Sequence, residues 1–299
     1  MNNTNNIDNT NNTSSSTSSV TAVTLNKFDH TKIELAKCKY SENNELVLDL
    51  PIKNVSNSIL PGVTVMVVTR NRKEFADIII DNWKRIRYPA DKLQLLIIDD
   101  SDQQSMGPVD ALRALKDKRI SYCYVEPKKD GVHSIGTKRN HGVSLAKFDY
   151  ICNMDDDDFL YDDSILARML TLLSYKKQCV YSDSIGVYNT KFESTYVVEN
   201  LNIIPPGSML FSKVFWNDKK FDEVNFIEAD SMVYGRENDM VRIPWFFSYV
   251  SIYHKSNVSQ LAKSIVKINK NRNNLTQATM NLWKTAFSKN FKDAVKKIM

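Results

Sequence analysis

The chain has 299 residues, of which 42% are hydrophobic and 25% charged. These proportions are those of an ordinary globular protein, so they exclude a collagen, a coiled-coil rod and a wholly disordered chain. The formal net charge of +5 is unevenly placed, because residues 255–299 hold ten Lys or Arg and a single acid, a local charge of +9 that leaves −4 for residues 1–254. A slightly acidic body with a basic tail argues against nucleic acid as a partner.

Two features of the sequence indicate the cellular compartment of the protein. The four cysteines are widely spaced and form no C-x-x-C pair, so we expect reduced, buried thiols. The amino terminus lacks the basic and apolar regions of a secretory signal, and no apolar run approaches the roughly 20 residues that cross a bilayer. We therefore expect a protein without signal peptide or transmembrane helix, cytoplasmic or held peripherally on the cytoplasmic side of a membrane.

The composition changes along the chain and predicts four regions. Residues 1–25 are almost entirely Asn, Thr and Ser, which is typical of a disordered tail. In the extension at 26–60, two apolar stretches flank the turn-prone Glu42-Asn43-Asn44 and favour a hairpin. Residues 61–256 are expected to form the main domain, and residues 257–299 a basic, amphipathic helical tail.

Strands and helices are expected to alternate through the main domain. Runs of β-branched and other apolar residues predict strands at 63–69, 93–99, 120–126 and 150–154. Amphipathic patterns predict helices at 74–87, 109–117, 134–147 and 164–175. This succession predicts an α/β fold with a mostly parallel sheet. Ligands of such sheets bind where the strands end, so the residues directly after each strand are the candidates for chemistry.

Two of the expected strands end in runs of acids, at 99–102 and at 155–158. Four consecutive carboxylates repel one another, so the second run needs a compensating cation, either basic side chains or a metal. Asp155 and Asp157 stand at alternating positions that suit Mg²⁺ or Mn²⁺ shared with substrate phosphates. A solvated acidic turn before the helix that begins near Ser164 has the same composition, and the run alone leaves both interpretations open.

Four segments of the main domain are informative together. They are VTVMVVTRNR at 63–72, LLIIDDSD at 95–102, GTKRNHGVSLAKFDYICNMDDDDFLYDD at 136–163 and KKFDEVNFIEADSMVYGR at 219–236. Their motifs and their order resemble those of the nucleotide-sugar glycosyltransferases of the GT-A fold, in particular family two, whose D-x-D motif lies in the third segment. The resemblance spans residues 61–256 and implies a Rossmann-like, mostly parallel sheet with helices on both faces.

The resemblance implies a metal-dependent transfer of a sugar from a nucleotide sugar, with a UDP-sugar as first choice, to a hydroxyl group. The acceptor class stays open between a glycan, a protein and a lipid-linked molecule. The implied ligands of Mn²⁺ or Mg²⁺ are Asp155 and Asp157, with His254 as a third ligand or as a structural histidine. A bound metal neutralises charge that develops on the departing diphosphate.

The nucleotide-sugar site implied by the resemblance draws on three of the segments. Its residues are Thr69, Arg70, Asn71, Asp100, Arg139 and Asp156. In this set Asp100 matches the acid that binds the nucleobase, while Arg70 stands where the family often has an aromatic residue, which leaves the nucleotide open. Lys138, beside Arg139, is either a phosphate-binding residue or a solvent-exposed helix residue.

Inversion, which is also implied by the resemblance, requires a carboxylate that takes the proton of the acceptor hydroxyl. Asp230 matches the second acid of the family's E-D motif, although Ala229 separates it from Glu228, so that the match is imperfect. Glu237 and Asp239 form a competing pair of the same chemistry. Asp230 is our first candidate for the general base, and Glu228 and Asp239 complete the candidate catalytic set.

The basic tail has an apolar face, because hydrophobic residues recur at three- and four-residue steps from Leu275 to Ile298. This amphipathic helix either attaches the protein to an anionic membrane or packs on the main domain with its lysines in solvent. A catalytically inactive protein of the GT-A fold that uses this tail to bind a membrane or another anionic partner is the alternative function. A nucleotide-sugar pyrophosphorylase ranks low, because TRNRKE replaces its Gly-rich loop.

Overall fold

The structure is a computed structural model of the 299-residue chain. It describes residues 33–43, 46–51, 56–128, 131–191, 194–199, 201, 203–224, 228–255, 257, 287 and 289–298. The expected disordered tail at 1–25 lies outside these residues, and so does most of the amino-terminal half of the helix expected from Leu275.

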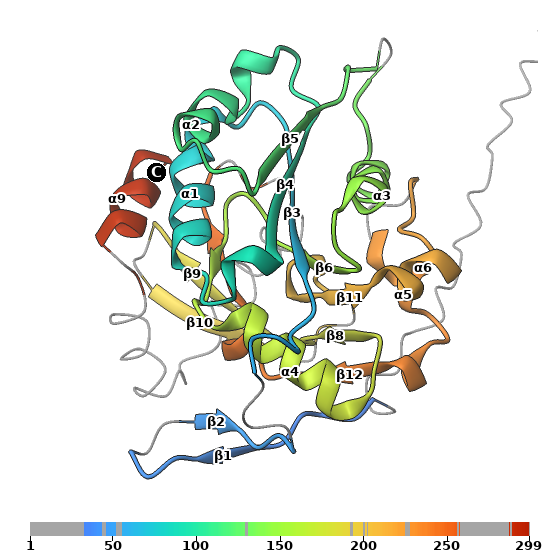
Figure 1. The fold of residues 1–299 in the computed structure, drawn as a ribbon. Coiled ribbons are helices and arrows are strands. Elements are labelled where there is room, and N and C mark those ends of the chain that lie inside the picture. The colour runs from blue at the N-terminus through green and yellow to red at the C-terminus, as the bar shows by residue number, and fades with distance from the viewer. Residues whose placement is uncertain are drawn as a thin grey trace, which may run out of the picture.

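A seven-stranded sheet forms the centre of the molecule, with the strand order β12-β8-β11-β6-β3-β4-β5 (Figure 1). In this order the strands are β12 (Met240–Arg242), β8 (Cys179–Tyr181), β11 (Leu210–Ser212), β6 (Tyr150–Asn153), β3 (Val63–Thr69), β4 (Leu93–Asp99) and β5 (Ile120–Tyr124). β11 runs antiparallel to both of its neighbours, and the other neighbouring strands run parallel. The predicted α/β fold with a mostly parallel sheet is confirmed.

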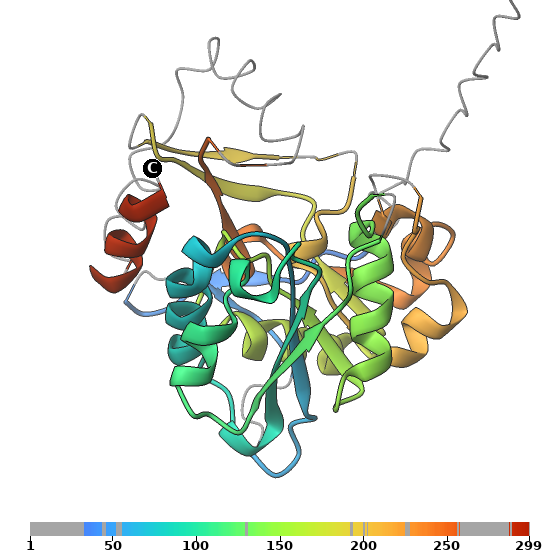
Figure 2. The same cartoon turned by 90° about the horizontal axis from the view of Figure 1, so that it is seen from above.

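Helices cover both faces of this sheet, as expected (Figure 2). One face carries α1 (Ala76–Arg85), α2 (Val109–Ala114) and α4 (Ser164–Tyr175). The opposite face carries α3 (Ile135–Leu145), α5 (Lys213–Asp218) and α6 (Glu228–Val233). Alternate residues of a strand point to opposite faces, so in β3 Val65 and Val67 enter the first core while Met66 enters the second. This double burial explains why β3 and β4 read as nearly continuous apolar runs.

Six short 3₁₀ helices connect the larger elements of the described chain. They are η2 (Lys73–Phe75), η3 (Ala90–Lys92), η4 (Gln104–Met106), η5 (Pro206–Ser208), η6 (Glu237–Asp239) and η7 (Trp245–Phe247). The helix expected at 74–87 is therefore divided into η2 and α1. It ends at Arg85 because Ile86 already has an extended ψ of 120°, which leads the chain toward Pro89.

A second sheet, which the sequence did not predict, has four strands in the order β10-β9-β13-β7. The strands are β10 (Ser194–Val198), β9 (Ile185–Asn189), β13 (Tyr249–Tyr253) and β7 (Phe159–Leu160). β7 begins directly after the acidic run at 155–158, and β13 ends one residue before His254. The antiparallel pairing of β13 with β7 therefore brings His254 to the acids.

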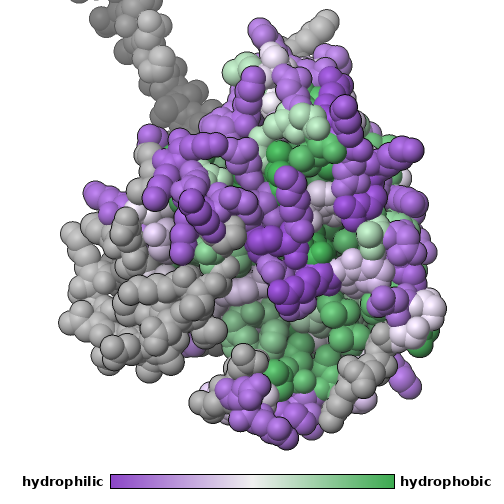
Figure 3. Space-filling model, turned by 60° about the vertical axis from the view of Figure 1, so that its left-hand side comes forward, coloured by the Kyte–Doolittle hydropathy of each residue, from purple (hydrophilic) through white to green (hydrophobic). Residues whose placement is uncertain are grey.

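The extension before the main domain forms an antiparallel pair of short strands, β1 (Cys38–Tyr40) and β2 (Leu46–Leu48). It is joined to the edge of the central sheet by a parallel bridge between Leu35 and Arg242. Figure 3 shows hydrophilic residues over most of one side of the molecule and a hydrophobic area low on that side. A hollow of about 480 Å³ lies between this extension and η7, lined in part by Leu35 and Phe246.

Apart from Asn257 and Phe287, the described part of the basic tail is α9 (Lys289–Ile298), which lies beside α1 (Figures 1 and 2). Its buried side chains join Phe75, Ile78 and Phe159 in a third apolar core. The buried residues of α9 are Phe291, Ala294, Val295 and Ile298. The apolar face of this helix is thus occupied by the body of the protein. Within the described residues, no helix has both the length and the apolar character needed to span a bilayer.

Candidate active site

Three neighbouring strands of the central sheet, β6, β3 and β4, end at the same edge. Thr69 is the last residue of β3 and Asp99 the last residue of β4, while β6 leads into the acidic run. Because the three strands run parallel, the polar residues that follow them meet at this edge. The Thr69 hydroxyl, for example, donates a hydrogen bond of 2.5 Å to Asp156.

The buried carboxylate of Asp99 organises the loop after β4. It accepts hydrogen bonds from the backbone N–H and the hydroxyl of Ser101, at 2.8 and 2.5 Å, and from the hydroxyl of Tyr122. Burial and the neighbouring Asp99 raise the pKa of Tyr122, so the phenol stays protonated and remains a donor. The hydrogen bonds of the Asp99 carboxylate therefore hold this loop together. Asp100 is the next acid along the chain.

Asp100 is fully buried and is paired with Lys138 of α3. The Lys138 ammonium donates to Asp100 at 2.7 Å and to the carbonyl of Thr69 at 3.2 Å. Lys138 is only 6% exposed, so its interpretation as a solvent-exposed helix residue is wrong. The backbone N–H of His133 donates to the other Asp100 oxygen at 3.3 Å. The predicted nucleobase acid is thus held in place from two elements.

Arg70 and Asn71 face the loop after β4 rather than the acidic run. Arg70 donates to Asp102 at 2.5 Å, and Asn71 exchanges hydrogen bonds with the same residue at 2.7 and 2.9 Å. Asn71 has a positive φ of 50°, a left-handed conformation that Asn tolerates better than most residues. Asp102, for which the sequence predicts no role, fixes the predicted nucleoside loop.

The four acids of the run have different partners. Asp155 accepts from Arg139 at 3.0 Å, and Asp156 accepts from Arg72 at 2.5 Å in addition to Thr69. Asp157 accepts from Arg72 at 2.6 Å and lies 3.2 Å from Nε2 of His254. Asp158 accepts from the backbone N–H of Ile252 at 3.0 Å. Asp156, Asp157 and Asp158 are buried, and every acid of the run except Asp158 pairs with an arginine, so the interpretation as a solvated acidic turn does not hold.

Burial and mutual repulsion set the ionisation of these acids. Burial and the charge of Asp157 raise the pKa of Asp156 to about 6. Burial raises the pKa of Asp155, and it raises the pKa of Asp158 well above its ordinary value with help from Asp157 and Asp155. Burial would also raise the pKa of Asp157, but the hydrogen bond from His254 and the charge of Arg72 outweigh it and lower that pKa. Asp157 is therefore the acid of the run that is most firmly ionised.

The predicted metal ligands fit a divalent cation in kind: carboxylate oxygens suit Mn²⁺ or Mg²⁺, and imidazole binds first-row transition ions such as Mn²⁺. Asp157 and His254 are already in contact. Yet the described residues contain no group of three acids, histidines or cysteines placed to hold a cation. Asp155 and Asp157 are held by different arginines, Arg139 and Arg72. In this structure, arginine side chains balance the charges of the two carboxylates that are predicted to bind the metal.

The segment before β11 covers one side of Asp155. A Cβ atom on Gly207 would lie 3.1 Å from an oxygen of Asp155, and the side chain of Asn153 donates to the carbonyl of Pro206 at 3.1 Å. Two residues before this stretch, the backbone N–H of Ile204 donates to Asp230 at 3.4 Å. This segment therefore links the acidic run to the acid predicted as general base.

Asp230 and Glu228 both lie on α6 and have different surroundings. Burial raises the pKa of Asp230 to about 6, and the nearby Glu228 adds to the shift. The carboxylate of Glu228 is buried and accepts a hydrogen bond from Arg139, which also holds Asp155. Asp230 has no cationic partner of this kind among the described residues. Glu228 is therefore a counter-ion for Arg139, and of the two acids Asp230 fits the predicted general base better.

Asp239 is not brought to this site. It precedes Met240, which pairs with Cys179, which pairs in turn with Phe211 and so with Ile151 near the start of β6. Asp239 therefore lies level with the amino end of β6, whereas the acidic run follows its carboxyl end. The spacing of the acids in the sequence gave no sign of this separation, because it depends on the order of strands at the sheet edge.

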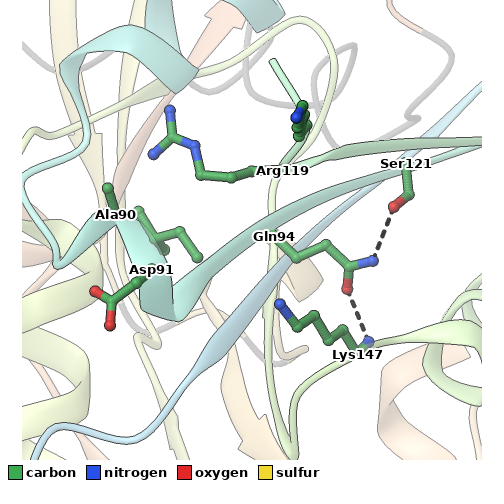
Figure 4. Close-up of a pocket in the computed structure, with 8 residues that line it drawn as sticks. Ala90, Asp91, Gln94, Arg119, Ser121 and Lys147 are labelled. Atoms are coloured by element: carbon green, nitrogen blue, oxygen red, sulfur yellow. Dashed lines mark hydrogen bonds between the residues drawn. The ribbon is translucent and has the colours of Figure 1, made fainter.

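A hollow of about 400 Å³ lies away from the acids, at the amino ends of β4 and β5 (Figure 4). Gln94 connects its walls, donating to Ser121 at 3.0 Å and accepting from the backbone N–H of Lys147 at 2.8 Å. Lys118 and Arg119 also line this hollow. It is on the opposite edge of the sheet from the acidic run, so it is not part of the candidate active site.

Comparisons with known proteins agree with this geometry. The family model described as glycosyl transferase family 2 matches residues 64–234, which is more than half of the chain. None of the curated proteins matches significantly. The fold resembles mannosyltransferase PcManGT from Pyrobaculum calidifontis, solved with GDP-Man and Mn²⁺, with a TM-score of 0.52 at 14% identity over 82% of this chain and 75% of that one.

The fold also resembles TarS residues 1–349 from S. aureus, solved with UDP-GlcNAc, with a TM-score of 0.50 at 11% identity over 79% of this chain and 72% of that one. At such identities these likenesses concern the fold alone. The family match and the site together identify the class of protein: the chain belongs to glycosyl transferase family 2 and is a glycosyltransferase of the GT-A fold.

Proposed function

We propose that the protein transfers a sugar from a nucleotide sugar to a hydroxyl acceptor with inversion, and that it requires Mn²⁺ or Mg²⁺. The observation that carries the proposal is the contact of Asp157 with His254 inside the buried acidic run. Asp157 and His254 meet at the carboxyl end of a sheet strand, where ligands of such sheets bind. The two structural relatives were solved with GDP-Man and with UDP-GlcNAc, which supports a nucleotide-sugar donor, and we retain a UDP-sugar as first choice.

The donor is proposed to lie along the edge formed by β6, β3 and β4. Asp100, fixed by Lys138, accepts a hydrogen bond from the nucleobase, and the loop with Arg70 and Asn71 borders the nucleoside. Asp157, His254 and Asp155 hold the metal, which neutralises the diphosphate when bound. Asp156, which accepts a hydrogen bond from Thr69, anchors the acidic run to the end of β3.

Asp230 is proposed to take the proton of the acceptor hydroxyl. The acceptor oxygen forms a bond to the anomeric carbon as the bond from that carbon to the diphosphate breaks, and the diphosphate leaves with the electron pair. The proton moves to the carboxylate of Asp230, whose pKa of about 6 suits a base that works near neutral pH. The Ile204–Gly207 segment, between Asp230 and Asp155, is the proposed acceptor side.

We also retain the proposal of a cytoplasmic enzyme with peripheral membrane contact through its tail. All four cysteines lie in the described residues and are free thiols, which suits a reducing compartment. Because the apolar face of α9 is buried, membrane contact would rest on its exposed lysines, such as Lys292 and Lys296, and would be electrostatic. Flotation with phosphatidylserine vesicles tests this point: binding that survives 0.5 M salt would contradict it, since such salt screens surface charges to about 4 Å.

The experiment that tests the proposed function uses a panel of UDP-, GDP- and TDP-sugars with Mn²⁺ or Mg²⁺. Nucleotide release and the thermal shift of the protein are measured for each donor, with EDTA as the control. We expect one nucleotide class to stabilise the protein only when metal is present. If no donor changed the melting temperature or released nucleotide, the proposed function would be wrong.

A further inference from the structure

One nitrogen of Arg72 lies between two carboxylates of the acidic run. Its Nη1 donates to Asp156 at 2.5 Å and to Asp157 at 2.6 Å. The guanidinium lies over the ring of Phe75, 4.7 Å from its centroid, and Phe75 is fully buried in the core beneath α9. Arg72 therefore contacts two acids through the edge of its guanidinium and an aromatic ring through its face.

The Asp157 oxygen that accepts from Arg72 is the same Oδ2 that meets His254. A divalent cation that binds the Asp157–His254 pair through this oxygen would lie within a few ångströms of the Arg72 nitrogen, which donates to the same atom at 2.6 Å. Two positive charges at this spacing repel each other, because like charges a few ångströms apart disfavour one another inside a protein. Arg72 and the metal therefore oppose each other at this oxygen.

Arg72 is better placed to move than Arg139, the other arginine of the run. The side chain of Arg139 is 5% exposed and is held by both Glu228 and Asp155. The side chain of Arg72 is 16% exposed, and its two acidic partners are neighbours in sequence. Moreover, a planar guanidinium released from carboxylates pairs well with the oxygens of a diphosphate.

We propose that Arg72 is a built-in counter-ion of the acidic run, which a divalent cation displaces from Asp157 and which then binds the diphosphate of the donor. This inference rests on the proposed function. It gives Arg72 two effects of opposite sign: it opposes metal binding by the protein alone, and it favours nucleotide binding once the metal is present. A purely structural arginine would favour both.

The test compares Arg72→Gln and Arg72→Lys with the wild type. Binding of Mn²⁺ alone is measured by electron paramagnetic resonance of the free ion, and binding of UDP and GDP in saturating Mn²⁺ is measured by calorimetry. Arg87→Gln is the matched control, because Arg87 is an exposed arginine that pairs with Asp163 outside the run. We expect Arg72→Gln to bind Mn²⁺ about tenfold more tightly and the nucleotide about tenfold more weakly.

Arg72→Lys keeps the charge but cannot bridge two acids as a guanidinium does. We expect it to bind Mn²⁺ more tightly than the wild type and less tightly than Arg72→Gln, while Arg87→Gln matches the wild type. If circular dichroism shows that Arg72→Gln does not fold, the Mn²⁺ affinity of Arg72→Lys relative to the wild type decides the test. Mn²⁺ affinity at or below the wild-type value in the folded variants would overturn the inference.

The outcome also separates this inference from the proposed function. If the wild type binds Mn²⁺ and nucleotide but Arg72→Gln binds both more weakly, the role of Arg72 alone is overturned. If neither the wild type nor the variants bind Mn²⁺ or any nucleotide, the proposed function fails together with it.

Discussion

The ring of Phe291 packs edge-on against the ring of Phe159, with 4.8 Å between their centroids. Phe291 belongs to α9 near the end of the chain, whereas Phe159 directly follows the acidic run at 155–158. Phe287 makes a similar contact with Phe159 at 4.8 Å. The described part of the basic tail is therefore a structural part of the catalytic domain, packed behind its acids.

Replacing Phe291 with Ala should destabilise the protein by about 3–5 kcal/mol, because a fully buried phenyl ring is lost and a cavity remains. Lys296→Ala, on the exposed face of the same helix, is the control and should change stability by less than about 0.5 kcal/mol. The free energy of unfolding in urea gives both values. Equal, small effects would show that α9 does not hold the domain together.

Lys138→Met should destabilise the protein by about 3 kcal/mol, because it takes the nearer cation from the buried carboxylate of Asp100 and leaves only Arg70, 3.9 Å away. Lys118→Met removes the same charge from an exposed position and should have little effect. Urea unfolding at pH 7 measures both variants. A Lys138→Met protein as stable as the wild type would mean that the pair does not form.

Asp230→Asn should lower the rate of transfer by about 10²–10⁴-fold, because an amide cannot accept the proton of the acceptor. Donor binding should stay within about twofold of the wild type, since Asp230 is proposed to face the acceptor. Transfer is measured with saturating donor, and binding by calorimetry. Asp239→Asn, at the other edge of the sheet, should retain wild-type transfer; if it lost transfer instead, the base would be misassigned.

The pH dependence of transfer follows from the raised pKa of Asp230. The carboxyl group acts as a base only when ionised, and burial raises its pKa to about 6. The value of kcat/KM should therefore fall about tenfold for each pH unit below 6 and level off above 7. A rate profile from pH 4.5 to 8.5 measures this limb. A limb centred near 4 would exclude Asp230 in its buried state.

Much of the central sheet was predictable, because strands buried on both faces must be apolar along their whole length. The runs at 63–69 and 93–99 therefore gave the bounds of β3 and β4 as the structure has them. The sheet of β10, β9, β13 and β7 was missed. Its strands are short or pair across large distances in sequence, and β7, with two residues, carries no periodicity of its own.

The site was predicted in part for a similar reason. Acids that follow strands are visible in a sequence, and the motif at 63–72 drew attention to the loop after β3. Thr69, Arg70 and Asn71 of that loop match the family's nucleotide loop, but nothing local in the sequence shows that Arg72 reaches acids more than 80 residues away. The same limit applied to Lys138, whose burial depends on how α3 packs on β3.

The most direct test of the proposed active site is calorimetric binding of the preferred donor nucleotide with and without Mn²⁺, for the wild type and for Asp157→Asn. We expect the wild type to bind the nucleotide at least tenfold more tightly when Mn²⁺ is present, because Asp157 contacts His254 and is the most firmly ionised acid of the run. Asp157→Asn should lose this metal-dependent gain. An Asp157→Asn protein that kept the full gain would contradict the assignment of the acidic run as the metal and diphosphate site.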